Sequence, residues 1–151
     1  MKNGSKEFNT INMIQLLKSQ ATTYGFRSWY PLLNKSGSNY PLVSEKLWAA
    51  YEDAIIEAQY LDCVWFDGEK IMPAVFKISG DSILEGLCRL KNVKELLPPY
   101  FSKFYFIVED NVYLKTLEEL SKPIFRNSEI IVLSKSELAK TIMNLIPKVK
   151  H

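Results

Sequence analysis

Residues 60–66 (YLDCVWF) and 71–79 (IMPAVFKIS) are the most informative stretch of this 151-residue chain. Both runs are rich in β-branched and aromatic residues, and the four residues between them, 67–70 (DGEK), include the turn formers Asp and Gly. Two such runs separated by a short polar segment are typical of antiparallel strands joined by a tight loop. We therefore expect a β-hairpin over residues 60–79.

Helices and further strands are predicted on both sides of this hairpin. Apolar residues three or four positions apart indicate helices, and short apolar runs between turn signals indicate strands. Asn9 or Thr10 is expected to cap the first helix, and Ser134 the last. The predicted order is helix 10–23, strand 26–30, helix 45–59, strands 60–66 and 71–79, helix 82–97, strand 103–109, helix 111–120, strand 129–133 and helix 134–146.

This order predicts an α/β fold with three layers. A hairpin that is followed by strands alternating with helices favours a central mixed β-sheet, antiparallel at the hairpin and parallel after it, flanked by helices on both faces. No linker divides the chain. Residues 10–147 are expected to form a single domain, preceded by a flexible N-terminus over residues 1–9 and followed by a C-terminal tail over residues 148–151.

Composition excludes several classes of protein. With 47% hydrophobic and 24% charged residues, the chain is neither disordered nor membrane-spanning by pattern. No secretory signal can be recognised in the opening residues, so a cytoplasmic protein without membrane contact is expected. The only histidine is His151, which leaves Ser-His-Asp and Cys-His hydrolases without a base, and no glycine-rich phosphate-binding motif is present.

The hairpin carries the candidate chemistry. A four-residue loop would pair Phe66 with Ile71 and hence Asp62 with Val75, which puts Asp62 and Lys77 diagonally next to each other on one face of the sheet. An acid on one strand and two polar residues spaced by two on the next is an arrangement suited to metal-dependent phosphodiesterases.

The hairpin and the helix after it resemble the restriction-endonuclease-like proteins with a PD-(D/E)xK motif. The resemblance lies in 61–66 (LDCVWF), 74–79 (AVFKIS), 81–83 (DSI) and 86–90 (GLCRL), and it extends over about residues 61–138. It implies that Asp62 corresponds to the first catalytic acid, Lys77 to the second acid and Ser79 to the third motif residue. Two of the three positions therefore depart from the family pattern.

This departure predicts a catalytically degenerate site. Lys77 would place a cation where a metal ligand is needed, and we expect it to pair with Asp62 and to occupy the space of the metal. An ordinary strand, with Lys77 reaching into solvent, is the alternative. Metal binding could be restored by an acid from elsewhere, with Asp62 and either Glu85 or Glu57 as ligands, although carboxylates on helices are usually only solvated.

Three functions remain open. The first is a catalytically degenerate nuclease-like domain that binds DNA or accompanies a restriction system, for which no cofactor is expected. The second is an active Mg²⁺-dependent endonuclease with a rearranged site. The third is a module for a homodimer or a partner protein. Basic residues that could contact DNA phosphates include Lys18, Arg27, Arg89 and Lys91, but solvated helix faces explain the same spacings.

Overall fold

The computed structural model describes residues 2–32, 43–68, 71–79, 82–98 and 102–138. Within these ranges, short 3-10 helices follow or precede several of the longer elements: η1 (Ala58–Tyr60), η2 (Asp110–Val112), η3 (Pro123–Phe125) and η4 (Lys135–Glu137). The longer elements are α1 (Lys2–Thr23), β1 (Arg27–Trp29), α2 (Glu45–Glu57), β2 (Cys63–Asp67), β3 (Ile71–Ile78), α3 (Ile83–Glu95), β4 (Lys103–Val108), α4 (Tyr113–Leu120) and β5 (Ile130–Ser134).

The five strands form one mixed sheet in the order β1-β2-β3-β4-β5. Strand β2 pairs antiparallel with both β1 and β3, whereas β3, β4 and β5 run parallel to one another. The crossovers from β3 to β4 and from β4 to β5 carry α3 and α4, as parallel neighbours require. The predicted mixed sheet is therefore confirmed.

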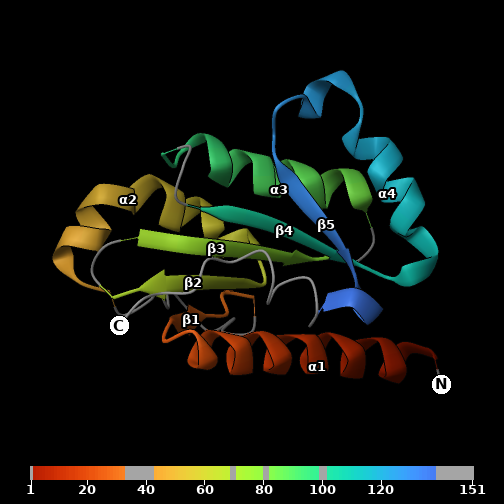
Figure 1. The fold of residues 1–151 in the computed structure, drawn as a ribbon, viewed down its shortest axis with the longest axis horizontal. Coiled ribbons are helices and arrows are strands. Elements are labelled where there is room, and N and C mark those ends of the chain that lie inside the picture. Colours follow the sequence, from red (N-terminus) through yellow and green to blue (C-terminus); the bar gives the residue numbers. More distant parts are fainter. Residues whose placement is uncertain (1, 33–42, 69–70, 80–81, 99–101, 139–151) are drawn as a thin grey trace.

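Helices cover both faces of this sheet (Figure 1). Helix α1 lies along one face, and α2, α3 and α4 lie on the other. The side chains of β4 alternate between the two cores: Phe104 and Phe106 pack on the α3 side, and Tyr105 and Ile107 pack on the α1 side. Because both faces are covered, the sequence of β4 after Lys103 is a continuous apolar run, 104–108 (FYFIV). The three-layer α/β fold is confirmed.

The hairpin has a different register from the one predicted. Val64 faces Val75 and Trp65 faces Ala74, but Asp67 faces Ile71, so Phe66 alone opposes two residues of β3. This is a β-bulge, and Pro73, which has no N–H to donate, lies in it. The observed register differs from the predicted one by two residues, so that Val75 faces Val64 and not Asp62. The bulge accounts for one of the two, and the pairing of Ile71 with Asp67, where Phe66 was expected, accounts for the other. An even shift keeps every side chain on its predicted face.

Several predicted boundaries are corrected by the structure. Helix α1 begins at Lys2, so Asn9 and Thr10 lie inside it and do not cap it; no proline interrupts this segment. Strand β2 begins at Cys63, because Ala58–Tyr60 forms η1. The side chain of Ser134 forms no capping hydrogen bond, and residues 139–146 of the predicted last helix lie outside the described part of the chain.

Among the described residues, no helix is both long enough and apolar enough to cross a lipid bilayer.

Candidate functional site

Asp62 lies between η1 and β2 and is almost fully buried, with 7% of its surface exposed. Its backbone N–H donates to the carbonyl oxygen of Phe76 at 3.1 Å, which holds it at the end of the β2–β3 ladder. Its Oδ2 accepts a hydrogen bond of 2.7 Å from the backbone N–H of Ile78 and lies 3.2 Å from the Nζ of Lys77. The carboxylate is thus fixed by two donors from β3.

Lys77 faces Asp62 from β3. Since Cys63 pairs with Phe76, the next residues outward, Asp62 and Lys77, oppose each other directly across the two chains and not diagonally. The Lys77 side chain is 18% exposed and that of Asp62 is 9% exposed, so the ion pair is largely shielded from water. The contact predicted from face parity is present, and the bulge at Pro73 makes it closer than the predicted register allowed.

Burial dominates the electrostatics of Asp62. Loss of solvation raises the pKa of this carboxyl above its ordinary value, and the charge of Lys77 and the hydrogen bond from Ile78 oppose that rise. The net direction is upward because desolvation is the largest of these effects. The charged form of Asp62 therefore depends on its two donors in the folded protein.

Ser79 follows β3 directly, and its backbone N–H donates to the carbonyl oxygen of Ile107 at 2.7 Å. It therefore extends the pairing of β3 with β4 at the carboxyl end of the sheet. Its position two residues after Lys77 places the two side chains on the same face.

A pocket of about 250 Å³ opens beside Lys77. The first turns of α3 form one wall, and the close approach of α3 to the sheet at Gly86 brings them there. A Cβ atom at Gly86 would lie 2.5 Å from Cε1 of Phe106 and 3.6 Å from Cγ of Lys77, so only glycine fits this position without a shift. The lining residues are Leu32, Tyr60, Lys77, Ser82, Glu85, Gly86 and Arg89; we call this the Lys77 pocket.

Arg89 is the second cation of the Lys77 pocket. Its Cζ lies 4.1 Å from the centroid of the Tyr60 ring, within the range of a cation–π contact. Its Nη2 lies 3.8 Å from Oε1 of Glu85, one helical turn earlier, which is an ion-pair distance too long for a hydrogen bond. Ser82 caps α3 in the same pocket, where its Oγ accepts a hydrogen bond of 3.1 Å from the N–H of Glu85.

The other sequence-predicted residues do not all gather at this site. Arg27 faces Phe66 at the opposite end of β2 from Asp62, four residues or about 13 Å along the strand. Lys18 is exposed on α1, on the other side of the sheet. Lys91 is on α3 but pairs with Glu95 and does not line the Lys77 pocket. Of the four DNA-contact candidates, only Arg89 lies beside Lys77.

The candidate metal ligands have other partners in this structure. Glu85 lines the Lys77 pocket with a side chain that is 67% exposed and pairs with Arg89. The Oε1 of Glu57, at the end of α2, accepts from the side-chain amide of Asn92 of α3 at 3.4 Å. In the described ranges, no three residues among His, Cys, Asp and Glu come together in a way that could hold a metal ion.

Sequence reasoning missed Tyr60 as a member of the site. It was assigned to the first hairpin strand, whereas η1 turns its ring toward Arg89, which lies 29 residues later in the sequence. No local pattern could signal this contact. Arg89, in contrast, was part of the 86–90 (GLCRL) resemblance.

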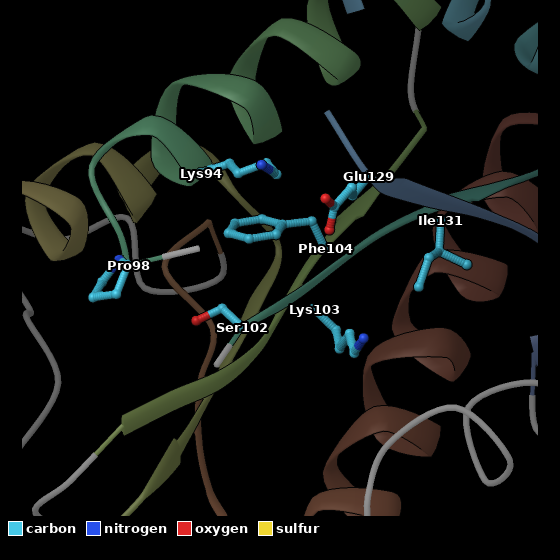
Figure 2. Close-up of a pocket in the computed structure, with 7 residues that line it drawn as sticks. All are labelled: Lys94, Pro98, Ser102, Lys103, Phe104, Glu129 and Ile131. Carbon is cyan, nitrogen blue, oxygen red and sulfur yellow. The ribbon is translucent and has the colours of Figure 1, made fainter. Parts of the chain in front are cut away.

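A second pocket lies at the opposite edge of the parallel strands, beside the amino ends of β4 and β5 (Figure 2). Lys94, at the end of α3, extends over it near the ring of Phe104, and Glu129 points in from the start of β5. The backbone of Glu129 has a φ of 58°, a left-handed conformation that is uncommon outside glycine and asparagine. Phe104, which lines this pocket, lies two residues before Phe106, the β4 partner of Lys77.

Comparison with known proteins gives two findings. A family model described as the Type II restriction enzyme NmeDI C-terminal domain matches residues 25–149. One relative, the Type II restriction enzyme NmeDI of Neisseria meningitidis serogroup C, is 34% identical over 118 residues, which cover 68% of this chain and 33% of the relative. The chain thus spans about one third of that relative's length. No solved structure matches this chain.

The family match covers most of the chain, including the whole hairpin, α3 and the last two strands of the sheet. This chain therefore belongs to the family of the C-terminal domain of the Type II restriction enzyme NmeDI.

Proposed function

We propose that this chain is a DNA-binding domain of a restriction system, built on a PD-(D/E)xK-type nuclease fold whose site has lost the ability to cut by itself. Membership of a restriction-enzyme family and the three-layer fold support the general role. The observation that carries the rest of the proposal is the ion pair between Lys77 and Asp62, 3.2 Å apart at the carboxyl end of β3.

The ion pair removes the conditions for metal catalysis in two ways. A metal-dependent phosphodiesterase needs at least two oxygen ligands that face one cation, and Lys77 supplies a positive charge where the second ligand would be. In addition, the ammonium group already satisfies the charge of Asp62, so Mg²⁺ would have to displace it. Glu85 lines the same pocket with a side chain that is 67% exposed, and we propose that it stays solvated and does not replace the second ligand.

DNA binding does not require the lost metal. Lys77 and Arg89 both line the pocket where a nuclease would hold a phosphodiester, and cations bind phosphate without any metal bridge. We propose accordingly that the domain keeps the DNA-binding half of a nuclease activity and leaves cleavage to another domain or subunit.

Calorimetric titration with Mg²⁺ and Mn²⁺ tests the metal claim. We expect the wild-type chain and Asp62→Ala to behave alike, with no site that depends on Asp62. A micromolar site that disappears in Asp62→Ala, accompanied by nicking of supercoiled plasmid in Mn²⁺, would establish the active-nuclease alternative and overturn the proposal.

Fluorescence anisotropy with a labelled duplex tests the DNA claim. We expect the logarithm of the binding constant to fall linearly with the logarithm of salt concentration, with the same slope in EDTA and in Mg²⁺ buffered to equal ionic strength. Absence of any salt-dependent binding would contradict DNA binding and favour the protein-interaction alternative.

A further inference from the structure

We infer that Arg89, which contacts the Tyr60 ring and is only weakly paired with Glu85, is the residue of the Lys77 pocket that contacts a backbone phosphate of DNA. This inference rests on the proposed DNA-binding function and adds to it a specific contact and a built-in competitor. The supporting observations are the contact of the guanidinium with the Tyr60 ring and its weak pairing with Glu85.

The guanidinium of Arg89 has few partners among the described residues. Its Cζ lies 4.1 Å from the centroid of the Tyr60 ring, a contact that restricts the position of the group. Within the described part of the chain, Glu85 is the only charged partner found for Arg89, and at 3.8 Å it forms no hydrogen bond. A guanidinium has paired N–H donors that suit the bidentate binding of a phosphate.

Glu85 acts as a weak competitor for the same guanidinium. Its side chain is 67% exposed, and an exposed i,i+4 pair of this kind is weak because water screens the two charges. A phosphate would displace it at little cost. Lys77, in the same pocket, adds a second positive charge but is already bound to Asp62.

Helix α3 offers a matched control. Lys91 and Glu95 form a second i,i+4 pair, and their side chains are 28% and 62% exposed, compared with 34% and 67% for Arg89 and Glu85. This control pair is directly hydrogen-bonded and does not line the Lys77 pocket. Substitutions in the two pairs change the net charge equally on the same helix, so net charge alone cannot produce a difference between them.

The experiment measures binding of a labelled duplex of random sequence to the full chain over a series of salt concentrations, in EDTA. We expect Arg89→Ala to weaken binding roughly tenfold and to reduce the salt slope by about 0.9, the value for one lost phosphate contact. We expect Lys91→Ala to change the affinity less than threefold, roughly, since it removes only a diffuse charge.

The acidic partners give the opposite change. Glu85→Gln should tighten binding several-fold, because the competitor is removed, whereas Glu95→Gln should have a smaller effect. A gain in affinity cannot come from misfolding, so this arm keeps the inference testable even if Arg89→Ala is unstable. Tyr60→Phe should bind as the wild type does, and Tyr60→Leu should bind more weakly, because the ring face and not the hydroxyl holds Arg89.

The assignment of Arg89 would be overturned if the two pairs had equal effects on DNA affinity. In that case Arg89→Ala would bind DNA no more weakly than Lys91→Ala, and Glu85→Gln would bind no more tightly than Glu95→Gln. DNA binding itself would remain established. If the wild-type chain itself shows no salt-dependent binding, the proposed function fails, and this inference fails with it. The two failures are therefore distinguished by the wild-type measurement alone.

Discussion

The ion pair between Asp62 and Lys77 bears on both the stability of the fold and the proposed loss of catalysis. A buried carboxylate needs donors, and Asp62 has the ammonium of Lys77 and the N–H of Ile78. The donor that satisfies it is also the group that replaces a metal ligand in the proposed site. Stability and loss of catalysis are therefore expected to depend on the same residue, and substitutions at Lys77 can separate them.

Replacing Lys77 with methionine keeps most of the side-chain volume and removes the charge. Because the folded-state pKa of Asp62 is raised, its contribution to stability is fully present below the unfolded pKa and is lost as pH rises through the folded-state pKa. Without Lys77 the pKa rises further and the loss grows. We expect Lys77→Met to lower the free energy of unfolding by about 2–4 kcal/mol at pH 7 and by much less below about pH 4.

Urea denaturation at both pH values measures this difference. Lys122→Met is the control, because Lys122 pairs with Glu119 on the surface with a side chain that is 56% exposed. It should cost less than about 0.5 kcal/mol at either pH. An equal loss for Lys77→Met at both pH values would mean that the charge of Asp62 plays no part in the loss, and it would contradict this prediction.

Restoring the family pattern should restore a metal site if the proposed degeneracy is correct. In the double variant Lys77→Glu with Ser79→Lys, a second carboxylate would face Asp62 from β3. We expect this variant to bind Mn²⁺ in a titration where the wild type does not, and the single variant Ser79→Lys to behave as the wild type does. Failure of the double variant to gain any metal affinity, although folded, would argue against the assignment of Lys77 to the second acid position.

At the scale of elements, the contact between α3 and β4 positions the site. Gly86 lets the helix lie directly on Phe106, and this brings Ser82, Glu85 and Arg89 beside the end of β3. The helix is also capped at the point where it meets the pocket, by Ser82. The close approach at Gly86 therefore both packs α3 against the sheet and places the start of the helix beside the pocket.

Adding a methyl group at Gly86 tests this arrangement. Gly86→Ala would place a Cβ atom 2.5 Å from Cε1 of Phe106, so the helix or the ring has to move, at an expected cost of about 1–3 kcal/mol. Phe106→Leu alone is also destabilising, but in combination with Gly86→Ala it should recover part of the loss because it makes room for the methyl group. A double-mutant cycle measured by urea denaturation gives the coupling, and additive effects would contradict the close approach.

At the scale of the whole molecule, one sheet separates two apolar clusters. Leu17 of α1 packs in one cluster and Leu87 of α3 in the other, and each side chain has no exposed surface. Strands β2, β3, β4 and β5 each contribute side chains to both clusters, so the two halves are joined through the backbone of the sheet.

This arrangement predicts one cooperative unit. Leu17→Ala and Leu87→Ala should each lower the free energy of unfolding by about 2–5 kcal/mol, and their effects should add because the sheet lies between them. Both should shift a single transition, followed by circular dichroism and by tryptophan fluorescence. Two separate transitions in either variant would show that α1 and its cluster unfold independently of the rest.

Sequence alone was enough for the order of the strands and helices, the mixed sheet and the shared face of Asp62 and Lys77. These follow from local periodicity and from the parity of side chains along a strand, and neither needs knowledge of distant contacts. The predicted faces were correct although the predicted register was not, because the pairing of Asp67 with Ile71 and the bulge at Pro73 together shift the register by two residues. The start of α1 was missed because no strong signal separates residues 2–9 from the helix that follows.

Tertiary structure alone decided what surrounds the pair. The direct opposition of Asp62 and Lys77 depends on the bulge, and the cation–π contact joins Tyr60 to Arg89 across 29 residues of sequence. The separation of Arg27 and Lys18 from Arg89 likewise appears only when the sheet and α1 are placed together. Sequence periodicity reports which face of its own element a side chain occupies, whereas contacts between elements depend on how their surfaces pack in three dimensions.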